Sequence, residues 1–458
     1  MNTMKKTTIL CLVSSIFGVT GITAQSNKVA EKPNILLIIT DQHTADAMSC
    51  AGNSYLKTPA MDKLAASGVR FEKNYVTQPL CLPSRSSLQT SRYPHEIGTV
   101  NNGSRILGDF PMLGNLVASA GYDCDYIGKW HVGTLLQKAG YKSGKDGKDG
   151  SKALNAVDYL LEKHKKPFFL TVSFTNPHNV CQLARADAVG TDLPDGPIAL
   201  PPTDLNKLPP LPENFGIPKN EPTIIREIQR NSKSHYPTAN WDELTWRQYL
   251  WGYYRLVEKV DDEIGKVLDA LKKGGYEDNT VVIYTSDHGE GVAAHHWNQK
   301  QILYEEAVRT PLIIQWNGIT KKRVYPELVS ENLDIPVTIL DIAGVKKPST
   351  MRGISLKPVL EGKSPLIRNF VVSETMFAHG KTNEGATGRM IRTKNFKYII
   401  YDNGEKREQL FDLETDPGEM NNLVYNKNYE AQLNKHRKLL LDWAKNTHDL
   451  EFPYIKPE

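Results

Sequence analysis

The sequence predicts an α/β fold in which a large, mainly parallel mixed sheet is flanked by helices, and a smaller C-terminal α+β subdomain containing a short antiparallel sheet follows. Continuous apolar runs at residues 33–40, 168–174 and 280–285 are typical of buried strands. Amphipathic stretches separate these runs along the chain. Alternating strands and helices favour a parallel sheet with helices on both faces.

The amphipathic stretches predict helices at residues 58–67, 151–164 and 241–273. In the third stretch Leu250, Val257 and Ile264 recur at helical spacing, and Gly274 with Gly275 ends the pattern. Each predicted helix can therefore bury one apolar face against the sheet.

The segment at residues 181–236 is rich in proline and has weak periodicity, so we expect an elaborated loop there. A polar connection at residues 364–368 leads to the smaller C-terminal unit. In that unit we predict strands at residues 370–373, 389–392 and 397–401 and a helix at residues 428–445. The predicted organisation is a signal peptide at residues 1–24, a catalytic domain at residues 25–365 and the C-terminal subdomain at residues 366–458.

The N-terminal residues have the pattern of a secretory signal peptide. Lys5 and Lys6 precede an apolar run at residues 8–20, and small residues end the segment at Ala24. The run is too short and mixed for a membrane span, which needs about 20 apolar residues. We therefore expect an exported protein, periplasmic or secreted, without stable membrane insertion.

Charge and cysteine content exclude several classes of protein. The formal net charge is +4, and it falls to +2 once Lys5 and Lys6 leave with the leader, so nothing favours a nucleic-acid partner. After cleavage the cysteines are Cys50, Cys81, Cys124 and Cys181. They are too few and too widely spaced for a disulfide framework, and they contain no CxxC pair for a structural zinc site.

Polar residues follow each predicted buried strand. Asp41 follows the first strand, His178 lies just beyond the second, and Asp287 follows the third. Ligands of open α/β sheets bind outside the carboxyl ends of the strands. We therefore expect these three side chains to gather in one site.

Residues 81–90, with the sequence CLPSRSSLQT, resemble the signature of the type I, formylglycine-dependent sulfatases of the alkaline phosphatase superfamily. The resemblance implies that a maturation enzyme oxidises Cys81 to formylglycine, whose hydrated aldehyde is a geminal diol. One hydroxyl can attack sulfur, and the other can then lose its proton and expel sulfate by reforming the aldehyde. An isolated cysteine is more often a buried thiol that packs as a small hydrophobe, so the companion motifs decide between the two interpretations.

Further motifs of this family occur in family order and extend the resemblance across nearly the whole mature chain. They lie at residues 38–42 (IITDQ), 128–133 (GKWHVG), 176–178 (NPH), 286–290 (SDHGE), 300–305 (Lys300 before Tyr304 and Glu305) and 410–423. Chance could supply one of these motifs but not the ordered set.

The resemblance implies a bound calcium ion acting as a Lewis acid on the sulfate. The implied ligands are Asp41, Gln42, modified Cys81, Asp287 and His288. Two features depart from expectation. Many relatives have a second aspartate where this chain has Gln42, and an imidazole is a poor match for a hard cation.

The same motifs imply the residues that surround the sulfate. Arg85 would hold the diol and the metal-bound oxygens, and Lys129 and Lys300 would supply positive charge. We predict His178 as the general acid to the departing alcohol and His131 as the base that deprotonates the second hydroxyl. A lone histidine or lysine is usually a surface residue, so these roles rest on the motifs.

Substrate specificity is expected from loops near this centre. The predicted substrate-binding residues are His95, Asn101, Asn102, His295 and Arg389, together with the segments at residues 181–236 and 384–389. Polar and aromatic side chains suit a sugar, which indicates a sulfated carbohydrate such as a glycosaminoglycan fragment. The adjacent His295 and His296 cannot easily share one tetrahedral zinc ion.

Two other functions are compatible with the same motifs. Phosphonate monoester or phosphodiester hydrolases of the superfamily can use the same modified cysteine and a similar metal cradle. A catalytically silent carbohydrate-binding relative would keep the fold alone. The filled positions of the nucleophile, the metal ligands and the sulfate contacts favour the sulfatase.

Overall fold

The large sheet has eight strands in the order β4-β3-β5-β1-β6-β7-β2-β8. The strands are β1 Asn34–Asp41, β2 Val69–Tyr75, β3 Asp123–Gly128, β4 Gly144–Lys145, β5 Phe168–Pro177, β6 Thr280–Ser286, β7 Leu312–Trp316 and β8 Arg323–Ser330. Neighbouring strands are parallel except at β7, which is antiparallel to both β6 and β2. This arrangement confirms the predicted mainly parallel mixed sheet.

The computed structural model describes Met1 and residues 32–142, 144–185, 193–231, 238–363, 368–377 and 385–456. Residues 33–458 form one compact unit. Residues 2–24 of the predicted signal peptide and the predicted boundary between residues 365 and 366 lie outside the described residues, so both stay predictions. No helix of the described part is long and apolar enough to cross a membrane.

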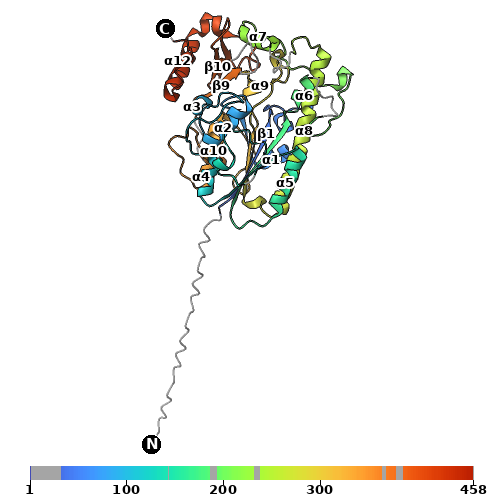
Figure 1. Cartoon of the computed structure of the whole chain (residues 1–458), viewed down its shortest axis with the longest axis vertical. Helices are drawn as coiled ribbons and strands as arrows, with labels where there is room; N and C mark the ends of the chain where they lie inside the picture. Colours follow the sequence, from blue (N-terminus) through green and yellow to red (C-terminus); the bar gives the residue numbers. More distant parts are fainter. Residues whose placement is uncertain are drawn as a thin grey trace. The chain divides into compact units, whose positions relative to one another are not determined.

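Helices cover both faces of the large sheet. They are α1 Pro59–Ser67, α2 Cys81–Thr90, α3 Pro94–Ile97, α4 Leu113–Ser119, α5 Asp149–Leu161, α6 Val180–Arg185, α7 Thr223–Asn231, α8 Glu243–Lys273, α9 Glu305–Val308, α10 Glu331–Ala343, α11 Lys357–Leu360 and α12 Glu430–Thr447. Figure 1 shows α5 and α8 on one side of the sheet, and α2, α4 and α10 on the other.

The central strand β1 contributes side chains to both hydrophobic layers, because successive side chains of a strand point to opposite faces. Leu36 and Ile38 pack in the cluster that includes α1, α5 and α8. Ile35 and Leu37 pack in the cluster that includes α4 and α10. All eight residues of β1 are buried, and β5 and β6 flank the strand in parallel register. The strand is therefore a rigid support for Asp41 at its carboxyl end.

The predicted C-terminal antiparallel sheet is also present, with strands in the order β12-β11-β10-β9. Its strands are β9 Val371–Phe377, β10 Ala386–Arg392, β11 Phe396–Tyr401 and β12 Glu408–Asp412. β9 contacts the segment just before Cys81, since Glu374 N donates to Thr77 O at 2.7 Å and Ser373 Oγ donates to Val76 O at 2.5 Å. The smaller sheet thus lies against the chain that leads into the predicted nucleophile.

The predicted loop at residues 181–236 is only partly a loop. It contains most of α6 and all of α7, and Ile224, Ile225 and Ile228 of α7 are fully or almost fully buried. The prediction is wrong for these helices, because the dense prolines upstream obscured a short apolar pattern with helical spacing. The predicted absence of a disulfide framework is consistent with Cys50, Cys81, Cys124 and Cys181, which are all free thiols.

Gly128 forms the sharp turn that leads from β3 into residues 129–133. Its φ is +101°, which is in the left-handed region, and a Cβ placed on it would lie only 1.9 Å from Ser173 O of β5. Only glycine fits this conformation and this close approach without strain. The turn directs Lys129 across the carboxyl end of the sheet.

Replacement of Gly128 by alanine should therefore lower the free energy of unfolding by about 3 kcal/mol or more, since both the backbone conformation and the contact with β5 become strained. Gly121 is a matched control, because its φ is +89° but no atom lies within 4 Å of a Cβ placed there. Gly121→Ala should cost only about 1 kcal/mol. Equal losses in denaturant unfolding of the two variants would contradict the steric argument.

Candidate active site

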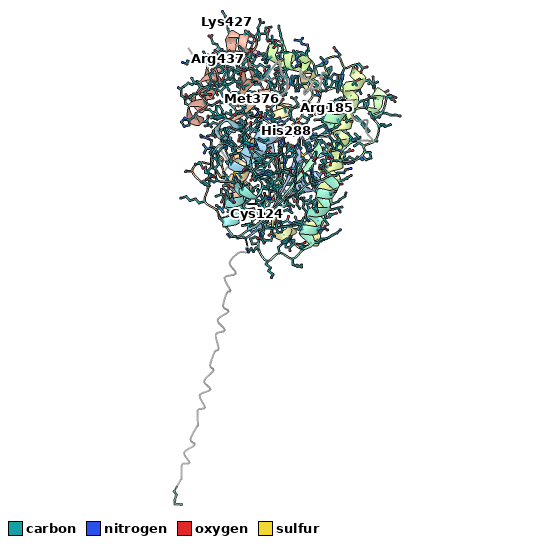
Figure 2. The ribbon with its side chains drawn as sticks, viewed as in Figure 1. Cys124, Arg185, His288, Met376, Lys427 and Arg437 are labelled. Atoms are coloured by element: carbon teal, nitrogen blue, oxygen red, sulfur yellow. The ribbon has the colours of Figure 1, made fainter. Side chains whose placement is uncertain are left out.

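Functional side chains meet at the carboxyl edge of the large sheet. Asp41 ends β1, Asp287 and His288 follow β6, Lys129 follows β3, and His178 follows β5. The predicted gathering of Asp41, His178 and Asp287 at this edge agrees with the strand arrangement. His288 is fully buried and lies in the interior of the folded unit (Figure 2).

Cys81 lies at the first position of α2 and faces this edge. Its Sγ is 3.1 Å from Lys300 Nζ, 3.2 Å from His288 Nε2 and 3.8 Å from Asp41 Oδ1. Burial and Asp41 oppose ionisation of the thiol, but Lys129, Lys300 and His288 hold the pKa of Cys81 well below its usual value. A small hydrophobe in a core would not lie among such charges, so the site is built to hold an anion at residue 81.

Arg85 lies one turn further along α2 and connects the two strand-end carboxylates. Its Nε donates to Asp287 Oδ2 at 2.7 Å, and its Nη2 donates to Asp41 Oδ2 at 3.2 Å. Its Nη1 donates to Lys129 O at 2.8 Å and to Ser173 Oγ at 2.7 Å. Arg85 is only 2% exposed. Its bonds to Asp41 and Asp287 fix the ends of β1 and β6 relative to α2.

The arrangement of the carboxylates fits a divalent cation. Ligand atoms of Asp41, Cys81, Asp287 and His288 all lie within 4.8 Å of one another, and all four residues are buried. Each aspartate gives Oδ2 to Arg85, while Asp41 Oδ1 and Asp287 Oδ1 lie 3.8 and 3.5 Å from His288 Nε2. Two hard carboxylate oxygens therefore face the same small space, as a calcium or magnesium ion requires.

Gln42 lies beside this cluster with a left-handed φ of 71°. Its backbone N donates to Asp287 Oδ1 at 3.2 Å. Its side-chain Oε1 accepts from Lys300 Nζ at 3.0 Å, and its Nε2 donates to Glu290 Oε2 at 2.5 Å. Both ends of the amide are therefore engaged by protein groups, and the role of Gln42 as a metal ligand stays a prediction.

Three of the predicted sulfate-contacting residues, Lys129, Lys300 and His178, lie near Asp41 and Cys81. Lys129 Nζ donates to Asp41 Oδ2 at 2.5 Å, and Lys300 reaches Cys81. Burial and the ammonium of Lys300 lower the pKa of His178 to about 3. Nδ1 of half-buried His131 is itself buried and has no hydrogen-bond partner among the described residues. Lys129, Lys300 and His178 therefore act electrostatically on Asp41, and the roles of all four residues at the sulfate stay predictions.

Asn102 contacts the helix that begins with Cys81, and Asn101 contacts the C-terminal sheet. Asn102 Oδ1 accepts from the backbone N of Leu82 at 3.1 Å, immediately after the nucleophile position. Asn101 Nδ2 lies 3.8 Å from Met376 Sδ of β9. These contacts place Asn102 beside α2 and Asn101 beside β9, and the role of both in substrate binding stays a prediction.

The other three predicted substrate residues make contacts within the protein. His95 Nδ1 bonds Glu374 Oε1 at 2.6 Å and Nε2 bonds Thr447 O at 3.1 Å. Arg389 forms a bidentate pair with Asp449 at 2.7 and 3.0 Å. His295 is 1% exposed, stacks on Tyr304 with ring centroids 3.8 Å apart, and lies 3.6 Å from Glu306 Oε2.

The described contacts of His95, Arg389 and His295 are with residues of the C-terminal unit or of the segment around α9. Their role in substrate binding stays a prediction. Glu384, part of the predicted substrate arm, lies outside the described residues. Sequence reasoning assigned no role to Glu290, although it lies inside the motif at residues 286–290 and contacts Gln42.

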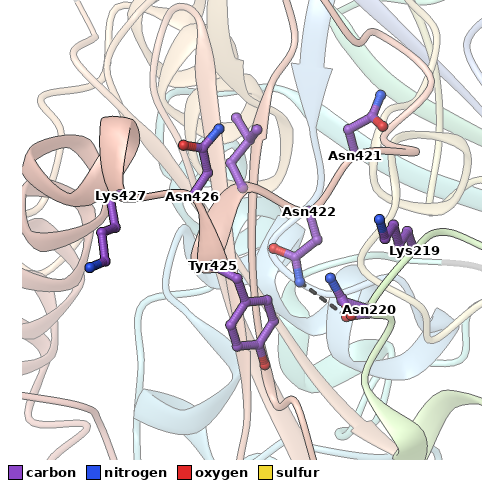
Figure 3. Close-up of a pocket in the computed structure, with 8 residues that line it drawn as sticks. Lys219, Asn220, Asn421, Asn422, Tyr425, Asn426 and Lys427 are labelled. Atoms are coloured by element: carbon purple, nitrogen blue, oxygen red, sulfur yellow. Dashed lines mark hydrogen bonds between the residues drawn. The ribbon is translucent and has the colours of Figure 1, made fainter.

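A separate surface cavity of about 410 Å³ lies at the far edge of the C-terminal sheet (Figure 3). It is lined by Lys219, Asn220, Asn421, Asn422, Leu423, Tyr425, Asn426 and Lys427. Asn422 is held in place because Oδ1 accepts from two backbone amides and Nδ2 donates to Asn220 O at 3.1 Å. Lys219 and Asn220 belong to the predicted substrate segment at residues 181–236, and the other residues that line this cavity have no predicted site role.

Comparison with known proteins agrees with this geometry. The sulfatase family model matches residues 33–152 and 138–345, and the model of the C-terminal region of N-sulphoglucosamine sulphohydrolase matches residues 293–446. The chain is similar to a Δ4,5-hexuronate-2-O-sulfatase of Bacteroides thetaiotaomicron, with 33% identity over 94% of this chain and 92% of the relative.

Two solved structures are similar in fold and sequence. A 2-O glycosaminoglycan sulfatase has a TM-score of 0.82 and 31% identity, covering 92% of this chain and 93% of the other. A second protein, solved in complex with its substrate D-glucosamine-2-N,6-O-disulfate, has a TM-score of 0.79 and 27% identity, covering 92% and 99%.

The fold and the centre around Cys81 define a hydrolase of the alkaline phosphatase superfamily. Within that superfamily the chain belongs to the formylglycine-type sulfatase family, and it is a sulfuric ester hydrolase.

The contacts of His95 make a prediction about stability and pH. Burial opposes protonation of His95, but Glu374 raises its pKa above 6.5. A raised folded-state pKa contributes stability that is fully present below the unfolded-state pKa of about 6.5 and is lost as the pH rises through the folded-state pKa. His95→Gln should therefore cost about 2 kcal/mol near pH 6 and less near pH 9.

This prediction is checked by denaturant unfolding of the wild type and of His95→Gln at both pH values. The exposed His448 supplies a His→Gln control, because it has no carboxylate partner among the described residues. A loss of stability in His95→Gln that was the same at both pH values would contradict the charged pair with Glu374.

Proposed function

We propose that this protein is an exported sulfatase that removes sulfate from a carbohydrate, such as a saccharide derived from a glycosaminoglycan, with formylglycine made from Cys81 and with a calcium ion. The single observation that carries the proposal is the position of residue 81. Its side chain lies within 3.8 Å of Lys300, His288 and Asp41, in a buried centre whose charges favour an anion.

The carbohydrate substrate is supported by the relatives. One relative is named for the 2-O-sulfate of a hexuronate, and a similar solved protein holds a glucosamine disulfate. Asn102, which contacts the residue after Cys81, and Asn101, which contacts β9, offer amide groups of the kind that bind sugar hydroxyls. Export is supported by the leader pattern of residues 1–24, and the formylglycine requires a maturation enzyme as a partner.

Formylglycine would supply a geminal diol at position 81, one hydroxyl for attack on sulfur and one for release of sulfate. Arg85 has the role of holding that side chain and the carboxylates in register, since it bonds Asp41 and Asp287 from the same helix. Lys129 and Lys300 offset the negative charge of the sulfate as it increases in the transition state. The unpartnered Nδ1 of His131 is suited to accept the proton of the second hydroxyl.

Calcium would supply positive charge that withdraws electrons from the sulfate. Asp41, Asp287, His288, Gln42 and residue 81 would hold it. The two buried Oδ1 atoms that face one another support an oxygen-preferring ion.

His178 is proposed to protonate the leaving alcohol. Its pKa of about 3 in the free protein reflects burial and the neighbouring Lys300. The negative charge of a bound sulfate ester favours the protonated form of His178. Substrate binding therefore raises the pKa of His178 toward the range where it can donate a proton. Proton donation would therefore be coupled to substrate binding.

The first test is Cys81→Ala in protein produced with a maturation enzyme. Alanine carries no thiol or hydroxyl that could be oxidised to an aldehyde, so turnover should fall on the order of 10³-fold or more. Initial rates on position-defined sulfated saccharides, aryl sulfates and phosphonate monoesters check this result and the substrate class. Full turnover by Cys81→Ala would refute the formylglycine mechanism, and turnover of phosphonates alone would favour the phosphonate hydrolase.

The second test separates the role of His178 from simple binding. His178→Ala should lower kcat on a sugar sulfate by about 10²–10⁴-fold, because the alcohol is a poor leaving group that needs a proton. The same variant should lose much less on 4-nitrophenyl sulfate, whose leaving group needs no proton. Equal losses on both esters would remove His178 from the role of general acid.

A further inference from the structure

We infer that Glu290 is a positioning residue that orients the amide of Gln42, and that the oriented amide holds Lys300 against residue 81. The inference rests on the proposed function, because the reacting group that Lys300 is held against is residue 81 of the proposed sulfatase. Glu290, Gln42 and Lys300 are 0%, 0% and 7% exposed, so water does not substitute freely for their mutual contacts.

The amide of Gln42 has only one orientation that satisfies both neighbours. One end lies 3.0 Å from Lys300 Nζ, and an ammonium can only donate hydrogen bonds, so this end must be the oxygen Oε1. The other end is then the amino group Nε2, which lies 2.5 Å from Glu290 Oε2 and needs an acceptor. A carboxylate supplies that acceptor.

Glu290 is itself held by two further donors. Tyr249 OH of α8 donates to Glu290 Oε1 at 2.5 Å, and the backbone N of Gln299 donates to the same oxygen at 2.6 Å. A backbone N–H can only donate, so Oε1 is fixed as an acceptor and Oε2 is directed at Gln42. The carboxylate therefore has no freedom to rotate away.

These contacts form a continuous chain from α8 to the nucleophile position. Tyr249 contacts Glu290, Glu290 contacts Gln42, and Gln42 contacts Lys300, whose Nζ lies 3.1 Å from Cys81 Sγ. The Gln42 amide lies between a cation and an anion with its dipole aligned to both. An aspartate at position 42 would face the Glu290 carboxylate with a second negative charge, so glutamine at this position fits the presence of Glu290.

Single substitutions should break the chain in defined ways. Glu290→Gln leaves one oxygen for Tyr249 and Gln299 and directs an amino group at the amino group of Gln42. If the Gln42 amide rotates to avoid this contact between two donors, its amino group then faces the ammonium of Lys300, which is also a donor. Gln42→Glu places two carboxylates in contact. Either change should lower kcat by about 10²-fold with KM altered much less, because a small displacement of a reacting group has that effect.

The reciprocal exchange Gln42→Glu/Glu290→Gln should restore function. The new carboxylate at position 42 accepts from Lys300, and it also accepts from the new amide at position 290. We expect kcat of the double variant on 4-nitrophenyl sulfate to recover to within about fivefold of the wild type, because the lost alignment is regained. The melting temperature should recover in parallel. Glu405→Gln, at an exposed glutamate, is the matched control.

Two results would overturn the inference: a double variant no more active than the poorer single variant, or a Glu290→Gln variant indistinguishable from Glu405→Gln. A wild type that hydrolysed no sulfate ester would overturn the proposed function instead. In that case the melting temperatures of the two single variants and of the double variant test the pairing of Gln42 with Glu290, because this measurement needs no substrate.

Discussion

The buried ion pairs of Arg85 with Asp41 and Asp287 are the constraint on which the rest of the site depends. A buried guanidinium loses its hydration, and it is tolerated only when its donors are satisfied with good geometry. Here the donors reach two carboxylates, a backbone carbonyl and a hydroxyl. Because Arg85 lies one turn after Cys81 on α2, the pairs also fix residue 81 at the carboxyl edge of β1 and β6.

The charge arrangement around this constraint explains what the site can bind. The two carboxylates of Asp41 and Asp287 face three cations, because Arg85 pairs with both of them, Lys129 pairs with Asp41, and Lys300 lies beside Cys81. The excess of positive charge attracts an anion near residue 81. In the C-terminal sheet, β9 packs on the chain that leads into this centre and on Asn101. The smaller sheet therefore supports the segment that carries residue 81.

The strands and the catalytic motifs could be predicted because their signals are local. Continuous apolar runs reveal β1, β5 and β6, and the motif at residues 81–90 specifies the start of α2. Partners that are far apart in the sequence could not be predicted. The pairing of His95 with Glu374 and of Arg389 with Asp449 is an example, because each pair joins distant parts of the chain. The pairing of Gln42 with Glu290 joins residues 248 positions apart, which no local pattern reveals.

The most direct test of the central claim is the mass of the peptide that contains residue 81, measured in preparations that differ in specific activity toward a sulfate ester. The account predicts that the fraction of peptide carrying formylglycine, as the aldehyde or its hydrate, rises in proportion to specific activity. Full sulfatase activity in a preparation whose peptide carries only unmodified cysteine would contradict it.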